Sequence, residues 1–380
     1  MDIPSLVLFN VDIIRFSIDL GILWIPLLVV SLTLNLEAGY AGVPNFGKVM
    51  FVAGGAAVAG SVSGRLAAII LGINTGGNFV ANSASIITQA NLEISNNPGL
   101  TAELFIIGVV LAAIVGAALG FVASFPAIRL REDYLGMLLL GAAQLFQIFL
   151  GAYDPIIGGS QPIGVPNLFW WVPNGIGWRD LGALAVMGSF AALVYLLVET
   201  FARSPLGRTL RAVRDNEVAA RALGKNDVAM RRDVIVFASA ISGIAGAMIT
   251  FYYSSVGAGT WDRVAYTFWP WVMIIIGGAA NNRGVAYGSL IFVTVLKILT
   301  QLKFALASIT IFPVDVNYLE YVVFGSALIL ILLFRPQGIV PEKSSFTLPP
   351  KTLSDIMRPK APIVREIGKE SLREEPSMDG

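Results

Sequence analysis

Long apolar runs separated by short polar segments dominate the chain, and many of them are long enough to cross a membrane. A hydrocarbon core of about 30 Å requires about 20 helical residues. The runs are continuous, whereas the strands of a membrane barrel alternate apolar and polar positions, so the pattern predicts helices. Six runs are clear: 20–36, 104–128, 134–153, 181–198, 234–255 and 318–334.

Three further runs are weaker. Run 49–64 is short and rich in glycine, run 267–278 is shorter, and run 284–300 carries Lys297 near one end. Together with the six clear runs they predict an all-α, polytopic membrane helix bundle of about nine transmembrane helices. We expect this transmembrane domain to span 20–340, after an N-terminal segment at 1–19. Residues 341–380 are rich in Pro, Lys, Glu and Ser, which is typical of a disordered tail.

The composition agrees with a membrane protein and narrows its chemistry. Hydrophobic residues make up 56% of the chain, charged residues only 13%, and the mean hydropathy is +0.74. The absence of cysteine and histidine excludes thiolate chemistry, disulfides, histidine-ligated metals and imidazole proton relays. A formal net charge of +1 gives no bulk attraction to nucleic acid. We therefore predict no catalytic residues, no metal and no cofactor.

The distribution of Lys and Arg predicts the orientation. Eight of the 26 lie between Arg203 and Arg232, and another eight lie from Arg335 to the C-terminus. By the positive-inside rule both segments are cytoplasmic, and the four runs between them are consistent with this. The polar loops 74–103 and 154–180 then lie outside, as does the N-terminus. We expect a multi-pass protein of the cell membrane with a cytoplasmic C-terminus.

The charged segment 203–232 reads as a cytoplasmic loop that contains one amphipathic helix or a pair of short ones. Pro205 suits a first helical turn and Gly224 suits a C-terminal cap. An apolar stripe recurs at helical spacing: Leu206, Leu210, Val213, Ala220 and Leu223. Basic residues lie mostly off that stripe: Arg208, Arg211, Arg214 and Arg221. Such a loop either lies on anionic lipid or docks onto a partner.

The order of residues in this loop favours docking. The stretch "EVAARALG" at 217–224 resembles the EAA loop of ABC importer permeases, whose short coupling helix docks into a groove of an ATPase subunit. That resemblance implies a coupling role for Glu217, Ala219, Ala220 and Gly224, with Arg208 and Arg214 beside them. The arginines can equally pin the loop to lipid headgroups. Physically, small alanines allow close approach, a carboxylate accepts charge-assisted hydrogen bonds, and glycine permits the turn.

Longer segments make the resemblance more specific. The block 204–248 is similar to the branched-chain amino-acid ABC permease family, as are "LNLEAGYAGVPNFGKVMF" at 34–51 and "FRPQGI" at 334–339. "LREDYLGMLLLGAAQLFQIF", "GGSQPIGVP" and "GGAANNRGVAYG" also resemble that family, the first two especially its M-type subunit. The resemblance covers roughly 20–340. Lys48 stands where a histidine is expected, so other amino acids and small amides such as urea stay open as solutes.

Several glycines are candidates for the translocation path or for a broken helix that faces a polar cavity: Gly39, Gly42, Gly277, Gly278, Gly284 and Gly288. Packing of loops explains them equally well. A second set follows the small-xxx-small pattern of closely packed membrane helices: Gly108, Ala112, Gly116 and Gly120. For this set, packing inside one subunit is favoured over a dimer face.

An ATP site on this chain is rejected. "GVPNFGK" at 42–48 matches the start of a P-loop, but Val49 stands where Ser or Thr must bind magnesium, and no strand precedes it. The resemblance therefore implies a non-enzymatic permease subunit of an ABC importer for branched-chain or related amino acids. The partners that it implies are ATPase subunits, a second permease that is a paralogue or a copy of this chain, and an extracellular or periplasmic solute-binding protein, besides the lipid bilayer.

The alternative is an ion-coupled secondary transporter or channel for a small polar solute such as urea or another amide. Such a protein is expected to carry ionisable groups inside the bundle. Here the acidic residues fall at the ends of the apolar runs, among them Glu37, Glu103 and Glu199. The pattern thus gives this alternative little support.

Overall fold

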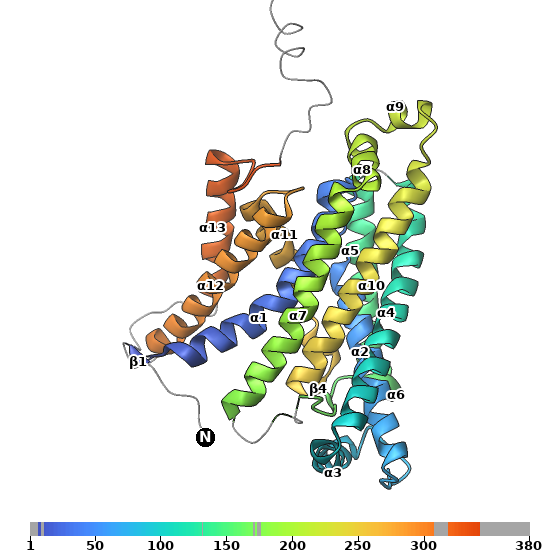
Figure 1. Cartoon of the computed structure of the whole chain (residues 1–380), viewed down its shortest axis with the longest axis vertical. Coiled ribbons are helices and arrows are strands. Elements are labelled where there is room, and N and C mark those ends of the chain that lie inside the picture. The colour runs from blue at the N-terminus through green and yellow to red at the C-terminus, as the bar shows by residue number, and fades with distance from the viewer. Residues whose placement is uncertain are drawn as a thin grey trace, which may run out of the picture. The chain divides into compact units, whose positions relative to one another are not determined.

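The computed structural model describes residues 7–8, 11–130, 132–169, 172, 176–307 and 318–342. The predicted tail at 341–380 lies almost entirely outside these residues. Helices form nearly all of the described secondary structure (Figure 1). The long ones are α1 (Ile13–Leu34), α2 (Lys48–Ile70), α4 (Pro98–Arg129), α5 (Glu132–Ala152), α7 (Ile176–Arg203), α10 (Asp227–Tyr253) and α12 (Asn282–Ala307).

Shorter elements connect or flank these helices. The short helices are α3 (Ser83–Asn96), α6 (Asp154–Ile157), α8 (Pro205–Asp215), α9 (Glu217–Ala222), α11 (Trp269–Gly277) and α13 (Leu319–Phe334). Two π-helical turns, η1 (Asn35–Tyr40) and η3 (Val264–Phe268), and one 3₁₀ turn, η2 (Ala258–Thr260), adjoin them. Strands β1 (Val7–Leu8) and β2 (Val11–Asp12) pair antiparallel, as do β3 (Ile163–Gly164) and β4 (Ser255–Val256).

The predicted all-α membrane bundle is confirmed. Among the described residues, seven helices are long and apolar enough to cross a membrane. Two shorter apolar stretches, Val264–Gly277 and Leu319–Phe334, correspond to the predicted runs 267–278 and 318–334. The total of about nine crossings depends on these short helices and stays a prediction. Helix α1 begins before the predicted run because the Asp12 side chain caps it, accepting from the backbone N–H of Ile14 at 3.1 Å.

Helices α2 and α10 form the centre of the bundle, and small residues let them approach each other closely. A Cβ on Gly246 of α10 would overlap the carbonyl oxygen of Val52 in α2, and one on Gly55 would overlap that of Gly243. On the other side of α10, a Cβ on Gly116 of α4 would lie 2.5 Å from the Ser239 carbonyl oxygen. The predicted small-residue face of α4 therefore packs against α10 within one subunit.

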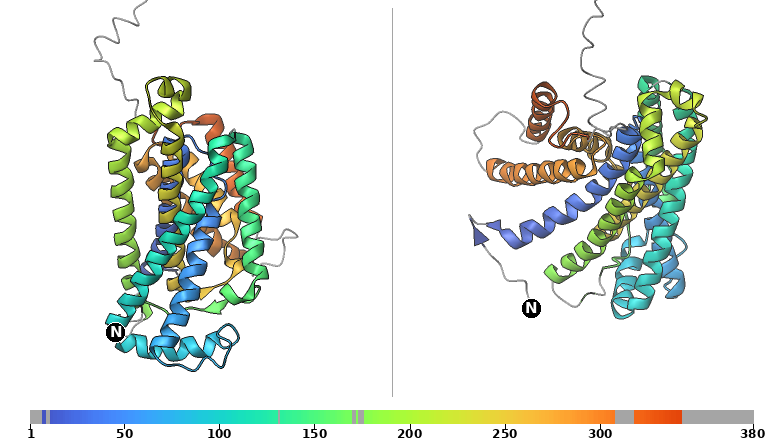
Figure 2. Two further views of the ribbon diagram at one scale, coloured as in Figure 1. Left: turned by 90° about the vertical axis from the view of Figure 1, so that its right-hand side faces the viewer. Right: turned by 45° about the horizontal axis from the view of Figure 1, so that its top comes forward.

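Helices α11, α12 and α13 gather beside α1 (Figures 1 and 2). A second hydrophobic cluster fills this side of the bundle, with Leu27 of α1, Met273 of α11, Phe292 of α12 and Phe324 of α13 buried in it. The Phe292 and Phe324 rings stack with their centroids 4.0 Å apart. Helix α1 contributes to both hydrophobic clusters, since its Leu28 and Leu32 belong to the main core.

The polar loop expected at 74–103 contains a helix that sequence analysis did not predict. In α3, Ile86, Ile87 and Ile94 are buried, whereas Leu92 on the other face is 62% exposed. This apolar spacing is that of an amphipathic helix. Figure 1 shows α3 and α6 at the end of the bundle opposite to α8 and α9. The two ends of the bundle therefore carry different kinds of surface helix.

Candidate functional site

The segment 203–232 forms the expected pair of short helices, and three polar side chains define their ends. Ser204 caps α8 by accepting from the Gly207 N–H at 3.3 Å, and Asn216 caps α9 by accepting from the Ala219 N–H at 3.0 Å. Asn226 caps α10 in the same way. Gly224 has a φ of +75°, a left-handed conformation that favours glycine, so its predicted role as the terminator of α9 is confirmed.

The residues in the middle of the predicted apolar stripe are buried, whereas those at its two ends are exposed. Leu210 and Val213 of α8 are buried against the bundle, whereas Leu206 is exposed. Asn216 interrupts the helix, so the register of α8 does not continue into α9. As a result Leu223 is 80% exposed, and Val218, which the stripe did not include, is 76% exposed. Val218 of α9 and Leu223, directly after its last residue, thus form an outward-facing apolar pair.

The two alanines of the motif have different surroundings. Ala220 lies on the buried face of α9, whereas Ala219 is exposed next to Val218. The backbone of α9 can therefore be approached closely from the side of Ala219. Arg208 of α8 is also exposed, as both interpretations of the loop require.

Glu217 anchors α9 to α10 inside the chain. Its carboxylate forms ion pairs with Arg221, one turn on, and with Arg231 of α10 at 3.2 Å. Arg221 in turn binds the buried carboxylate of Asp227 through two N···O contacts of 2.8 Å. Bidentate pairs of this kind fix geometry as well as charge. Two arginines of the same chain therefore already pair with the Glu217 carboxylate, and its expected contact with a partner stays a prediction.

Arg214 connects α8 to η1 and to the end of the described chain. Its guanidinium donates to the Gly39 carbonyl and pairs with the Glu342 carboxylate at 3.0 Å and with Asp215 at 3.0 Å. Burial lowers the pKa of Arg214, but the bonds to Asp215 and Glu342 outweigh it and hold that pKa above its ordinary value. The alternative that Arg214 binds lipid headgroups does not fit these internal contacts.

The predicted path glycines lie at the same junction. A Cβ on Gly42, whose φ is +68°, would lie 2.8 Å from Cγ of Arg214, and one on Gly39 would lie 2.6 Å from the backbone nitrogen of Ala280. Gly42 therefore lets the chain after η1 approach α8, and Gly39 lets η1 approach the turn between α11 and α12. Of the predicted coupling residues, the structure brings Arg214 to these two glycines, although they are far apart in sequence.

The other four glycines serve a tight crossing of backbones. A Cβ on Gly277 would overlap the Gly284 carbonyl, and one on Gly288 would overlap that of Met273. Gly278, at φ +110°, lies against the Val340 carbonyl. The N–H groups of Ile339 and Val340 donate to the carbonyls of Ile276 and Gly277, both at 2.9 Å. These contacts favour the loop-packing alternative, because the C-terminal segment already satisfies the carbonyls at the end of α11.

A buried ion pair next to η1 was missed by sequence analysis. Lys48 Nζ lies 2.8 Å from Oε2 of Glu37, and both side chains are completely buried. Asn45 donates to the same oxygen at 3.1 Å. Sequence analysis placed Glu37 at the end of an apolar run and had no signal that the chain turns back to bring Lys48 onto it. Such pairs are costly to separate.

Polar side chains extend this junction to α7 and α12. The side-chain amide of Asn35 in η1 donates to Asn282 of α12 at 2.9 Å, and Asn282 donates to Glu199 of α7 at 2.9 Å. Asn35 also accepts from the backbone N–H of Ala280 at 2.8 Å. The π-helical turn η1 thus contacts α7, α8 and the start of α12, which makes it the structural centre of the candidate site.

Comparison with known proteins shows the family of this chain. A family model described as "Branched-chain amino acid transport system / permease component" matches residues 18–332. The chain belongs to this family. A probable branched-chain amino acid transport permease protein LivM of Methanocaldococcus jannaschii is 36% identical over 335 residues, which cover 88% of this chain and 96% of that protein.

Two bacterial relatives are more distant. The high-affinity branched-chain amino acid transport system permease proteins LivM of Salmonella typhimurium and Escherichia coli are 25% and 24% identical over 253 residues, which cover 61% of this permease and 56% of each relative. No solved structure matches the permease significantly. The resemblance inferred from the sequence is confirmed, and the comparisons give no support to an ion-coupled carrier or channel.

Proposed function

We propose that this permease is the membrane-spanning subunit of an ABC importer for branched-chain amino acids, and that a separate ATPase subunit hydrolyses the ATP. The branched-chain amino acid permeases to which it is similar support the solute class. The outward face of α9 supports docking of an ATPase subunit, and this observation carries the proposal. Val218 and Leu223 are among the most exposed large apolar side chains of the described residues.

The surroundings of α9 make membrane lipid a poor explanation for that face. Helices α8 and α9 form the end of the bundle (Figure 1), and Glu217 lies beside the apolar pair. A partner groove that excludes water from Val218 and Leu223 would gain about 1.5 to 3 kcal/mol for each fully buried side chain. Ala219 lets the partner backbone come close. We therefore assign α9 as the coupling helix, with the charged residues around it holding its orientation.

Movement of α9 would reach the membrane helices through the contacts of α8. Arg214 joins α8 to the Gly39 carbonyl, and the guanidinium of Arg211 lies 5.6 Å from the ring centre of Tyr40, also in η1. Nucleotide-driven closure of two ATPase subunits would pull α8 and displace η1. Because η1 continues α1 and precedes α2, the displacement would switch the bundle between inward-open and outward-open states.

The proposal includes an orientation and further partners. The Lys and Arg around α8 and α9 support a cytoplasmic position for that end of the bundle and for the C-terminus, in a protein of the cell membrane. The opposite end, with α3 and α6, would then receive a solute-binding protein. A second permease, either a related chain or another copy, would complete the pathway.

Co-purification tests the proposal. The tagged permease should retain its ATPase subunits in mild detergent, and Val218→Asp should lose them, because a charge placed in an apolar interface stays desolvated. The matched control is Leu92→Asp, which alters an exposed leucine at the other end of the bundle and should have no effect. If Val218→Asp binds the ATPase as the natural chain does, α9 is not the docking helix.

A further inference from the structure

A wide groove lies at the end of the bundle opposite to the coupling helix. It has a volume of about 940 Å³, and it is formed by the outer end of α2, the turn that follows α2, the start of α3 and the segment 154–162. Figure 1 shows α3 and α6 at this end, away from α8 and α9. Two charged side chains belong to the lining, Arg65 of α2 and Asp154 of α6. The groove therefore offers a partner one cation and one anion.

Arg65 comes from the far end of a membrane helix. At about 1.5 Å per residue, it lies about 26 Å along α2 from Lys48, which is beside η1 and the coupling end. A charged side chain in a membrane helix is costly, and it is found where it faces water or serves a function. Under the proposed orientation, the groove gives the half-buried Arg65 access to the outer water.

Neutral groups hold the guanidinium of Arg65 in place. One terminal nitrogen donates to the Ser61 carbonyl at 3.0 Å and also to the Ser61 hydroxyl, and the other donates to the Pro155 carbonyl. The Cζ atom lies 5.0 Å from the ring centre of Phe79, which is a cation–π contact. Because none of these partners carries a charge, they orient the cation without neutralising it.

Two other basic side chains of the protein show what Arg65 lacks. Lys297 pairs with Asp19 at 3.1 Å, and Lys303 pairs with Glu320 at 2.9 Å. Among the described residues, no carboxylate forms an ion pair with Arg65, and its Nε–H has no acceptor. A fixed arginine with an unused N–H attracts an anion, and carboxylates match its forked geometry. The groove is therefore suited to an acidic ligand.

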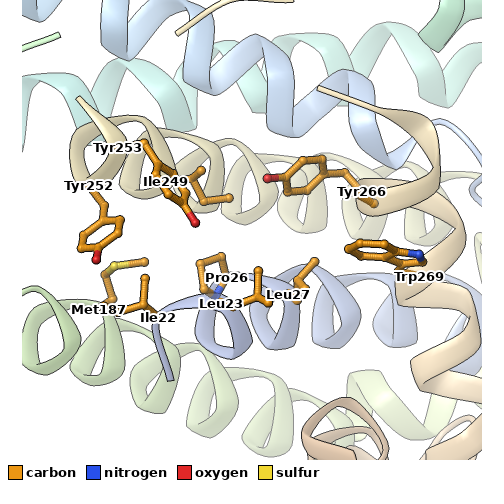
Figure 3. A pocket seen from close by; sticks show the side chains of 11 residues that line it. Ile22, Leu23, Pro26, Leu27, Met187, Ile249, Tyr252, Tyr253, Tyr266 and Trp269 are labelled. Atoms are coloured by element: carbon orange, nitrogen blue, oxygen red, sulfur yellow. The ribbon is translucent and has the colours of Figure 1, made fainter. Parts of the chain in front are cut away.

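The size of the groove favours a protein segment over the transported solute. A cavity that holds benzene has about 150 Å³, so about 940 Å³ is several times what a branched-chain amino acid fills. Inside the bundle, the cavity between α1, α7, α10 and the η3–α11 segment (Figure 3) has about 40 Å³, which is room for about one water molecule. Neither space has the dimensions of a solute site.

The lining of the groove is unlike a surface that faces lipid tails. Polar side chains from three segments contribute to it: Thr75, Asn78, Ser83 and Gln161. The exposed side of α4, in contrast, carries large apolar side chains: Ile106, Val110 and Ile114. A mixed polar and apolar surface is typical of contacts between proteins that associate reversibly. The position at the outer end and the lining both favour a water-soluble protein as the occupant.

We propose that this groove is the docking site of the solute-binding protein, and that Arg65 binds an acidic side chain of that protein. The inference rests on the proposed function and deepens it, because it gives the outer partner a site and a chemistry. Asp154, from α6, offers a matching site for a basic side chain. Charge pairs of this kind fix the register of a complex and speed its formation.

The affinity of the two proteins tests the contact. The purified transporter is placed in nanodiscs of zwitterionic lipid, and the dissociation constant of its leucine-loaded solute-binding protein is measured. Arg65→Gln should weaken binding about tenfold, because it removes a desolvated charge contact. Added salt should weaken binding by this variant less than binding by the natural chain. Natural affinity in Arg65→Gln overturns the proposal, and an anionic lipid headgroup is then the better ligand for Arg65.

Two changes at Ala84 test the charge without altering Arg65. Ala84 is exposed in the first turn of α3 and lines the groove. Ala84→Glu should weaken binding severalfold, because the new carboxylate competes for Arg65, whereas Ala84→Lys should keep or strengthen binding. Gln89→Glu, which is exposed on α3 outside the lining, is the matched control and should bind as the natural chain does. Equal losses in Ala84→Glu and Ala84→Lys contradict the proposal, since side-chain bulk would then explain both.

The same variants separate this inference from the proposed function. Arg65 and Ala84 lie at the opposite end of the bundle from α9, so the ATPase subunits should co-purify with every variant. If Ala84→Glu binds the solute-binding protein normally and also transports leucine, the docking site alone is wrong. If the natural chain retains no ATPase subunit, the proposed function itself is wrong.

Discussion

Arg214→Ala should uncouple the cytoplasmic loop from the membrane helices. The change removes a charged hydrogen bond to the Gly39 carbonyl and a contact of 3.0 Å to Glu342, whose side chain is 32% exposed. A hydrogen bond to a charged group contributes about 1.5 to 3 kcal/mol. A half-exposed ion pair adds at most about 1 kcal/mol, and Asp215, which is 66% exposed, adds almost nothing.

The total is about 1.5 to 4 kcal/mol for the contacts that Arg214 makes with η1 and with Glu342. At about 1.4 kcal/mol per tenfold change, the junction should open about 10 to 700 times more often. Hydrogen exchange of the backbone amides of η1 and α8 measures this opening directly. Leucine uptake should fall in parallel, while the ATPase subunits remain bound, because α9 keeps its own contacts through Glu217 and Arg221.

Two variants sharpen the test. Arg208→Ala removes an exposed arginine of the same helix and should leave the hydrogen exchange of η1 unchanged. Arg214→Lys keeps the charge but loses the forked geometry, so it should be intermediate. If Arg214→Ala exchanges and transports like the natural chain, α8 does not transmit movement through η1. If it loses the ATPase subunits while staying folded, Arg214 acts at the docking surface instead.

Three further changes probe the fold around the site, each measured as thermal unfolding in detergent. Gly246→Val should destabilise the protein by about 1 to 3 kcal/mol or more, since a side chain there meets the Val52 carbonyl; an unchanged midpoint would contradict the close crossing of α2 and α10. Lys48→Met should cost about 3 to 5 kcal/mol because it leaves Glu37 buried and unpaired, and adding Glu37→Leu should recover most of the loss. Gly224→Ala should cost only about 1 kcal/mol, because the strain is in φ and open space surrounds the new Cβ; a larger loss would indicate an unrecognised contact.

The junction at η1 gives the buried polar residues a common explanation. Glu37 and Lys48 are taken out of water, yet they lie where α1 ends and α2 begins, beside the contacts from Asn35 and Arg214. Burying a charge is tolerated only when a partner and hydrogen bonds compensate for it. A buried ion pair stabilises one arrangement of α1 and α2, because any arrangement that separates the two charges costs free energy. Such a pair suits a junction that must transmit movement without deforming.

The sequence by itself determined the helices and the class of protein. Apolar runs of membrane length are a local property, so the bundle could be predicted, as could the helix ends marked by Pro205 and Gly224. The order of residues at 217–224 and the longer segments also identified the family. The helical periodicity does not continue through Asn216, where α8 ends and α9 begins. For this reason the exposure of Leu223 was wrongly predicted and that of Val218 was not predicted.

Only the tertiary structure decided which residues meet. The pairs Glu37–Lys48 and Arg214–Glu342 join positions whose sequence neighbours give no hint of the partner. The glycines at 277 and 284 are explained by the two backbones that cross there. The physical reason is the same in each case. Helix formation depends on neighbours a few residues away, whereas ion pairs, close crossings and cavities depend on how the whole bundle packs.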